Sequence, residues 1–189
     1  MSEQFENKEF TQADFESDRF KEGIYEDCHF SGCQLIEWDL SGSSFIECTF
    51  ENCDLSMVKL NETAFRDVTF SNCRMQGVDF SRCKQFLLQM TFENCQLNLA
   101  SFYQLKLVKT KFTDCSLREA DFTEGDFSSS WFEECDLDRA IFHRTLLDKA
   151  DLSSAMNFMI DPDLNSIQGA KFSRDNLAGL VMKYGIVIK

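Results

Sequence analysis

The chain has 189 residues, a formal net charge of −13, twenty phenylalanines, nine cysteines and a single proline. This length suits one domain, and the negative charge argues against ordinary binding to a nucleic-acid phosphate backbone. Because no apolar run approaches the length of a membrane span and the first residues lack an apolar leader, we expect a cytoplasmic protein with no membrane partner.

A five-residue period dominates the sequence. A large apolar residue recurs at every fifth position from Phe5 to Phe80, and after a slip of two residues the series resumes at Phe92 and runs to Leu152. An amphipathic helix needs a period near 3.6 and a half-buried strand one of about 2, so neither fits. The position two before most of the large residues is small or compact, as at Cys53, although Trp38, Leu105 and Asp18 depart from this pattern. Repeats this short bury their apolar residues only by stacking, which predicts a solenoid.

Several units have one composition, namely Ala or Cys, then Asp, then Phe or Leu. They lie at 13–15, 53–55, 120–122, 135–137 and 150–152. Through these units the sequence resembles the pentapeptide-repeat family. The resemblance implies an all-β solenoid, a right-handed quadrilateral β-helix in which four pentapeptides form the four sides of each coil.

We assign residues 1–155 to this β-helix, with the two-residue frame slip within 81–91, and residues 156–189 to a C-terminal turn, helix and strand. The slip segment contains three consecutive apolar residues, Phe86, Leu87 and Leu88. They form either a buried bulge or a loop that contacts a partner.

The C-terminal segment departs from the repeat. Pro162 predicts a turn, Ser173 is a candidate N-cap for a helix, and Gly185 suits the position just after that helix. The apolar residues 186–188 predict a short strand. Because the last coil of a solenoid exposes its core, this segment either covers the end within one chain or joins two chains in a symmetric dimer. The residues assigned to this cap or dimer contact are Leu177, Leu180, Val181, Tyr184, Ile186 and Ile188.

All nine cysteines fall on the small inward position of the repeat, where a thiol serves as compact apolar filler. Their spacing follows the repeat rather than the short turns of zinc sites. The two histidines, His29 and His143, lie outside the inward positions, and no catalytic or phosphate-binding motif occurs. We therefore expect no enzyme, no metal and no cofactor.

With twenty residues per coil, the charged residues can be assigned to the sides of the rod. Two adjacent sides hold most of the net negative charge, whereas the other two carry nearly equal numbers of acidic and basic residues. A rod with repeated carboxylates offers a DNA-binding protein a surface like a duplex backbone, although acidity that merely keeps the rod soluble is the alternative. The carboxylates assigned to this partner-binding face are Glu9, Glu51, Glu93, Asp114, Glu133, Glu134, Asp151, Asp54, Asp136 and Asp138.

The stretches 73–80, 169–172, 177–182 and 184–188 are similar to those of a subgroup of the family, the Qnr-type quinolone-resistance and microcin B immunity proteins. The resemblance implies a DNA mimic that forms a homodimer through its C-terminus. It also implies binding to type II topoisomerase, chiefly DNA gyrase and possibly topoisomerase IV, with protection from quinolones or a peptide toxin, or modulation of the enzyme. That subgroup's resistance proteins carry projecting loops, and only one short interruption is found here. The alternative function is a structural protein-interaction rod without a topoisomerase partner.

Overall fold

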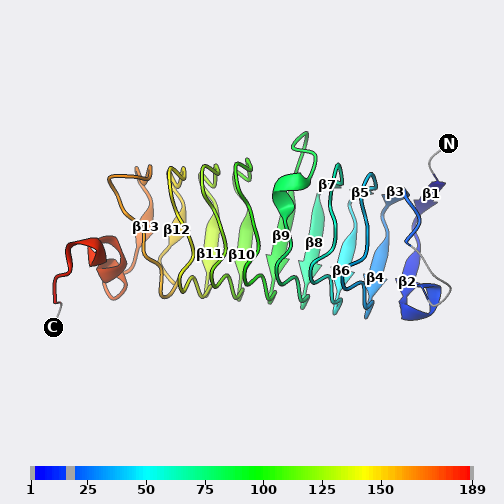
Figure 1. Cartoon of the computed structure of the whole chain (residues 1–189), viewed down its shortest axis with the longest axis horizontal. Helices are drawn as coiled ribbons and strands as arrows, with labels where there is room; N and C mark the ends of the chain where they lie inside the picture. The colour runs from blue at the N-terminus through cyan, green and yellow to red at the C-terminus, as the bar shows by residue number, and fades with distance from the viewer. Residues whose placement is uncertain (1–2, 16–19, 188–189) are drawn as a thin grey trace.

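The described part of the protein is a rod of stacked coils that run from its N-terminal to its C-terminal end (Figure 1). The computed structural model describes residues 3–15 and 20–187. A four-stranded sheet on one side has the order β1 (Glu3–Glu6), β3 (Gly23–Glu26), β5 (Ser44–Ile46) and β7 (Ala64–Arg66). Every strand pairs in parallel with its equivalent in the next coil. The prediction of an all-β solenoid is confirmed.

A nine-stranded sheet forms a second side along the whole rod, and we call its outer surface the long-sheet face. In chain order its strands are β2 (Glu9–Thr11), β4 (His29–Ser31), β6 (Thr49–Glu51), β8 (Val68–Ser71), β9 (Met90–Glu93), β10 (Lys111–Thr113), β11 (Trp131–Glu133), β12 (Asp151–Leu152) and β13 (Lys171–Phe172). The other sides pair through isolated parallel bridges, such as Gln34 with Asp54 and Asp79 with Ser101. Within the described ranges no helix is both long and apolar enough to cross a membrane.

The core is a set of columns in which each large residue lies directly above its equivalent in the preceding coil. The rings of Phe30 and Phe50 stack at 4.4 Å and 7°, and those of Phe92 and Phe112 at 5.1 Å and 2°. Rings of neighbouring columns meet edge to face, which is the other favourable arrangement of aromatic pairs. The five-residue period therefore corresponds to one large inward side chain per side of each coil.

The corners of the coils use left-handed backbone. Asn52, Asn72 and Asn94 follow one another at a single corner with φ of 54°, 53° and 51°. Asn tolerates this region better than most residues, which explains its recurrence there. The N–H of Asn52 donates to the carbonyl of Ser71 in the next coil at 3.0 Å, so each corner also joins two coils.

The two-residue slip is absorbed locally. Strand β6 pairs Phe50 with Phe70, and β8 pairs Phe70 with Phe92, so the same column continues across the insertion. The rings of Phe70 and Phe92 still stack at 5.3 Å. The extra residues follow the 3-10 helix η2 (Phe80–Arg82), and the loop there extends further from the rod than the turns of neighbouring coils (Figure 1).

The C-terminal segment differs from its prediction. Parallel pairing continues to β13, and the predicted helix is replaced by two short 3-10 turns, η3 (Leu177–Leu180) and η4 (Met182–Tyr184). Asn176 rather than Ser173 precedes the first turn. The carbonyl of Gly179 accepts from the N–H of Ile160 at 3.0 Å, and this bond to the preceding coil competes with a continuous α-helix.

Gly185 ends the second turn in the left-handed conformation, as expected. The predicted strand at 186–188 is wrong for its described part. Ile186 and Val187 are exposed and pair with no strand of the described chain, and Ile188 lies outside the described residues.

At the other end, β2 is followed by the 3-10 helix η1 (Gln12–Phe15), whose Phe15 side chain is buried. The aromatic side chains here pack against one another, with Phe5 stacked on Tyr25 at 4.6 Å. The core thus reaches the N-terminal coil, although Phe5 and Phe10 are only partly buried because no coil precedes them.

Candidate acidic partner-binding face

The long-sheet face places three of the predicted glutamates in one column. Glu51, Glu93 and Glu133 lie at equivalent positions of β6, β9 and β11, with Ser71 and Thr113 between them. Successive glutamates are therefore two coils apart, which is about 10 Å at the usual strand spacing. In each of these strands the residue before the Glu is an inward Phe, so the carboxylates point to solvent as predicted.

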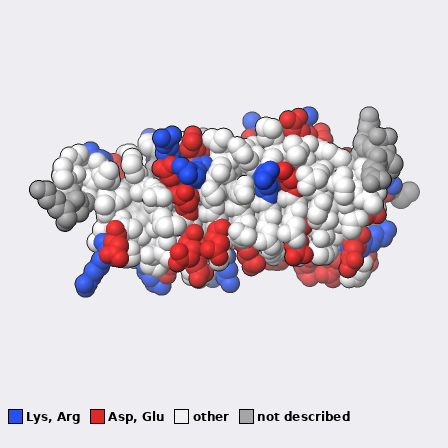
Figure 2. All heavy atoms as spheres, turned by 90° about the horizontal axis from the view of Figure 1, so that it is seen from below, with Lys and Arg blue, Asp and Glu red and all other residues white. Residues whose placement is uncertain are grey.

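Five of the ten predicted carboxylates form no ion pair with another described residue and are exposed. They are Glu9, Glu93, Asp114, Glu133 and Glu134. Four of these lie between β9 and the corner that follows β11, in the C-terminal half of the rod. We call these four, Glu93, Asp114, Glu133 and Glu134, the open acidic cluster. Figure 2 shows acidic side chains in clusters along the length of the rod, most of them near the lower edge of that view, with basic side chains between the clusters.

The other predicted carboxylates are partly or wholly engaged. Glu51 lies 3.3 Å from the imidazole of His29, and Asp151 lies 3.0 Å from the ammonium of Lys171. The Ser153 hydroxyl donates to Asp151, and this bond together with Lys171 holds the pKa of the Asp151 carboxyl below its usual range. Asp151 is therefore ionised at neutral pH.

On the adjacent side, Arg118 contacts Asp136 at 3.8 Å and Asp138 at 2.8 Å. Asp54 corrects the sequence interpretation. It is nearly buried, and its carboxylate accepts from the backbone N–H and the hydroxyl of Ser56, at 3.0 and 2.6 Å. Arg74 in the next coil lies 3.6 Å from the same carboxylate, so Asp54 is engaged within the rod and is not available to a partner.

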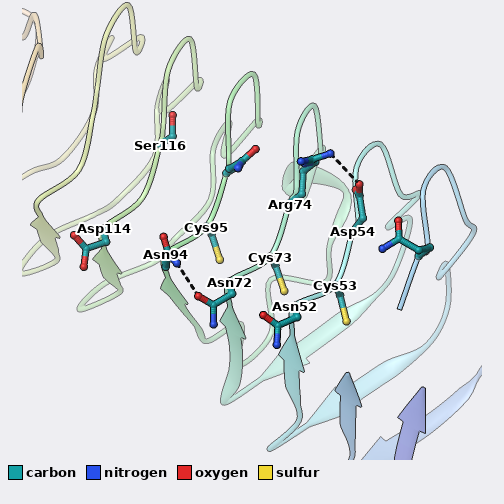
Figure 3. A pocket seen from close by; sticks show the side chains of 12 residues that line it. Asn52, Cys53, Asp54, Asn72, Cys73, Arg74, Asn94, Cys95, Asp114 and Ser116 are labelled. Carbon is teal, nitrogen blue, oxygen red and sulfur yellow. Dashed lines mark hydrogen bonds and ion pairs between the residues drawn. The ribbon is translucent and has the colours of Figure 1, made fainter. Parts of the chain in front are cut away.

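A shallow groove of about 420 Å³ runs along the corner between these two sides (Figure 3). Its rim is the column Asn52, Asn72, Asn94 and Asp114, and the Asn94 amide donates to Asn72 at 2.7 Å. Cys53, Cys73 and Cys95 lie at its base with their side chains buried. The lining is mainly neutral and polar, and the described residues contain no group of His, Cys, Asp and Glu placed to hold a metal ion.

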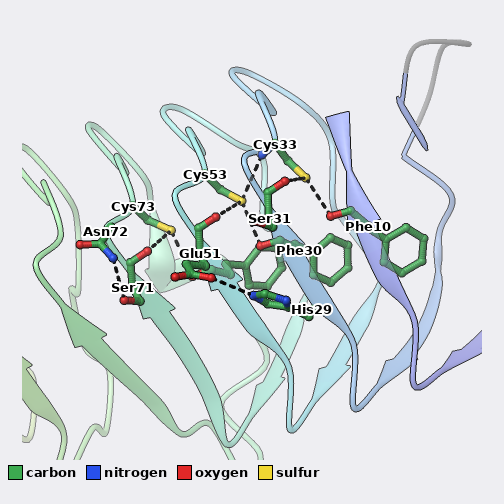
Figure 4. Close-up of polar contacts among 11 residues, drawn as sticks. Phe10, His29, Phe30, Ser31, Cys33, Glu51, Cys53, Ser71, Asn72 and Cys73 are labelled. Atoms are coloured by element: carbon green, nitrogen blue, oxygen red, sulfur yellow. Dashed lines mark hydrogen bonds and ion pairs between the residues drawn. The ribbon is translucent and has the colours of Figure 1, made fainter. Parts of the chain in front are cut away.

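All nine cysteines are buried free thiols. Most donate through sulfur to backbone carbonyls, as Cys53 does to Phe30 at 3.4 Å and Cys73 to Phe50 at 3.3 Å (Figure 4). Burial raises the pKa of Cys48 to about 12, so this thiol is neutral at neutral pH. These contacts agree with the interpretation of the cysteines as filler, and they add a hydrogen-bonding role that the period alone did not reveal.

The slip loop exposes two of its three apolar side chains. Phe86 is 78% exposed and Leu87 is 54% exposed, whereas Leu88 is half-buried and packs against the core. A wholly buried bulge is therefore wrong. The loop is held by Leu88 and by an amide contact from Gln85 to the carbonyl of Gln104 at 3.5 Å, which leaves Phe86 and Leu87 free to meet another molecule.

The C-terminal cap is also apolar at its surface. Tyr184, Ile186 and Leu177 are exposed, whereas Leu180 and Val181 are half-buried and Leu180 packs on the core. Ile188, the last residue assigned to this contact, lies outside the described residues. The ammonium of Lys183 binds both Asp161 and Asp163, which ties the cap to the preceding turn.

Sequence reasoning did not single out Trp131, which is an exposed aromatic residue. Trp131 is the first residue of β11 on the long-sheet face and is 39% exposed. A tryptophan at an outward position of a strand was the available signal, since the fivefold period places it between the buried Ser130 and Phe132.

The sequence matches a family model described as "Pentapeptide repeat region" through overlapping segments at 23–98, 43–122 and 83–152. A search of curated proteins finds no match. Among solved structures, full-length QnrB1, a plasmid-mediated fluoroquinolone resistance protein, aligns with a TM-score of 0.65 at 20% identity, covering 97% of this chain and 97% of that chain. Two trypsin-treated QnrB1 variants, each 20% identical, align with TM-scores of 0.63 and 0.65. They cover 100% of this chain, and the alignments span 98% and 100% of the respective QnrB1 chains. At this identity the likeness concerns the fold alone.

Proposed function

The chain belongs to the pentapeptide-repeat family, and from that premise we propose that it is a cytoplasmic, non-enzymatic DNA mimic that binds a type II topoisomerase, DNA gyrase or topoisomerase IV. Binding would protect the enzyme from quinolones or a peptide toxin, or modulate its activity. The observation that supports this proposal most directly is the open acidic cluster on the side of a narrow rod.

The charge density of the rod favours the proposal. Nine parallel strands span roughly 38 Å at the usual strand spacing. A net charge of −13 over this length gives one negative charge per ~3 Å, compared with about 1.7 Å in duplex DNA. The rod therefore presents about half the linear charge of DNA, enough to attract a basic DNA-binding surface by long-range electrostatics.

Two further features fit a partner protein of this kind. The slip loop offers Phe86 and Leu87 as apolar contacts, and the exposed apolar cap supports a homodimer that doubles the length of the rod. QnrB1, which has the same fold, is described as a fluoroquinolone resistance protein, and we extend a role of that kind to this chain as part of the proposal.

A supercoiling assay with purified gyrase, with and without a fluoroquinolone, tests the proposal. We expect the wild-type protein to change either basal supercoiling or inhibition by the drug. Reversal of the open acidic cluster to Lys should abolish this effect, because the basic surface of the enzyme would then meet like charge.

The matched control reverses four acidic residues away from the open acidic cluster. Glu26, Glu47, Glu62 and Asp67 are exposed and have the same summed charge as the open acidic cluster, so their change to Lys alters net charge equally. Equal loss in both variants would mean that net charge rather than this surface matters. No effect of the wild-type protein at saturation would contradict the proposal and favour a structural rod.

Deletion of Phe86 and Leu87, which restores the twenty-residue frame, separates a contribution of the loop from that of the open acidic cluster.

A further inference from the structure

A small cavity opens on the long-sheet face beside Trp131. Its volume is about 210 Å³, and its lining consists of Trp131, Glu133, Asp151, Ser153 and Ser154. Sites for small molecules and cofactors usually occupy about 300–1,000 Å³. This cavity is therefore the size of one side chain of another protein rather than of a cofactor.

The register of the sheet builds the cavity from two neighbouring coils. Trp131 pairs directly with Asp151 in the next coil, and Glu133 lies two residues after Trp131 on the same side of β11. The indole thus forms one wall, and two carboxylates lie around it. These are long-range contacts of the solenoid, because Trp131 and Asp151 meet only after a full coil.

The two carboxylates of this cavity, Glu133 and Asp151, are acceptors of hydrogen bonds. Glu133 forms no ion pair within the described chain and is exposed. The Asp151 carboxylate is ionised, since the Ser153 hydroxyl and Lys171 lower its pKa, and its contact with Lys171 lies at the surface, where such a pair is weak and exchangeable. The Ser154 hydroxyl accepts from the Glu134 backbone N–H at 3.0 Å.

The indole already attracts a cation from the preceding coil. The ammonium of Lys111 lies 5.9 Å from the centre of the Trp131 ring, at the outer limit of a cation–π contact. An electron-rich ring, a free carboxylate and a second ionised carboxylate around one small cavity favour a cationic ligand. The flat surface of the indole favours a flat cation.

We propose that this cavity receives an arginine side chain of a partner protein, with the guanidinium stacked on Trp131 and hydrogen-bonded to Glu133 and Asp151. Arginine suits it better than lysine because its planar group stacks on aromatic rings and donates to carboxylates through two N–H groups at once. The inference rests on the proposed function, because the basic DNA-binding surface of a topoisomerase would supply such an arginine. It assigns to Trp131 the part of an anchor, a role for which Trp and Arg are enriched in protein interfaces.

The test begins with a probe that contains no topoisomerase. N-acetyl-arginine amide is titrated into the ¹⁵N-labelled protein, and the two indole N–H signals, from Trp38 and Trp131, are followed and assigned with Trp131→Phe. We expect a saturable shift of the Trp131 signal and none of the Trp38 signal. The uncharged isostere N-acetyl-citrulline amide should bind at least about threefold more weakly, as should the arginine probe to Glu133→Gln. Equal binding of arginine and citrulline probes, or an unmoved Trp131 signal, would overturn the inference.

The second arm uses gyrase and the Trp131→Ala protein. We expect its half-maximal concentration in the supercoiling assay to rise about tenfold, as for a residue central to an interface. Ile141→Ala, which removes an apolar side chain of 52% exposure elsewhere on the rod, is the control and should leave that concentration unchanged. If the arginine probe binds but the wild-type protein has no effect on gyrase, the proposed function is contradicted and the assignment of the cavity is retained. If the wild-type protein acts on gyrase and Trp131→Ala has the same half-maximal concentration, the role of Trp131 as an anchor is contradicted.

Discussion

At the scale of single residues, the small inward position of the repeat is a hydrogen-bond donor as well as a space-filler. Cys73 donates to the carbonyl of Phe50, Thr63 to that of Leu40 and Thr145 to that of Phe122, always one coil back. The carbonyl belongs to the large inward residue, so it lies against the core and away from water. Cys, Ser and Thr recur there because each is small enough for the core and satisfies this buried acceptor.

Two serines at this position provide a test. The Ser130 hydroxyl donates to Leu107 at 3.0 Å and accepts from Thr110 at 3.1 Å, whereas the Ser43 hydroxyl is buried and has no hydrogen-bond partner among the described residues. We expect Ser130→Ala to lower the free energy of unfolding by about 1–2 kcal/mol. Ser43→Ala should leave this free energy unchanged or raise it. Urea unfolding of both variants measures the difference, and equal costs would contradict the donor role.

At the scale of elements, a local sequence pattern determines the position of the insertion, whereas contacts between distant residues determine the form of the cap. The insertion could be predicted from the sequence because the five-residue period resumes after it, which requires Phe70 and Phe92 to pair in neighbouring coils. The form of the cap could not be predicted from the sequence. Its 3-10 turns depend on the hydrogen bond from the Ile160 N–H to the Gly179 carbonyl and on the close approach of Gly179 to Phe158. A Cβ at Gly179 would lie 2.3 Å from the Phe158 carbonyl oxygen.

The contact of Lys183 with Asp161 gives the cap a pH dependence. Lys183 holds the pKa of the Asp161 carboxyl below its ordinary value, and the two carboxylates raise that of the Lys183 ammonium. For Asp161 the folded pKa is the lower one, so its stabilisation is complete above the unfolded value of about 4 and is lost as pH falls through the folded pKa. Lys183→Met should therefore lower the melting temperature at pH 7 and have little effect in strong acid. Thermal unfolding at both pH values is the measurement, and an equal loss at both would exclude the ion pair as its cause.

At the scale of the whole molecule, the rod separates its charged and apolar surfaces. The open acidic cluster lies along one side, whereas many of the exposed apolar residues of the C-terminal end, among them Met182, Tyr184 and Val187, gather on the cap. An apolar surface at one end of a rod suits a two-fold contact, in which the same residues of two copies meet and the rods extend in opposite directions.

This arrangement predicts that a charge placed on the cap changes the oligomeric state of the protein. Tyr184, 64% exposed on the cap, becomes buried in such a contact, so Tyr184→Asp should convert a dimer to a monomer by placing an unpaired charge in the interface. Tyr103→Asp, at an exposed position in the middle of the rod, should leave the mass unchanged. Sedimentation equilibrium measures both masses. A wild-type monomer at all concentrations would assign the cap to one chain only.

The sequence by itself determined the solenoid, the stacked columns, the inward cysteines and the position of the insertion. It could do so because in a short stacked repeat the period alone decides which side chain enters the core. It also identified the side of the rod on which Glu93, Asp114, Glu133 and Glu134 lie.

Only the tertiary structure decided which carboxylates are available. Asp54 is held by its own turn and by Arg74, Asp151 is shared with Lys171, and Glu133 is free beside Trp131. These differences arise from contacts between successive coils and from small changes in burial, neither of which a five-residue period contains. The same reason explains the cap, whose turns follow from distant partners, and the cavity, whose walls belong to two coils.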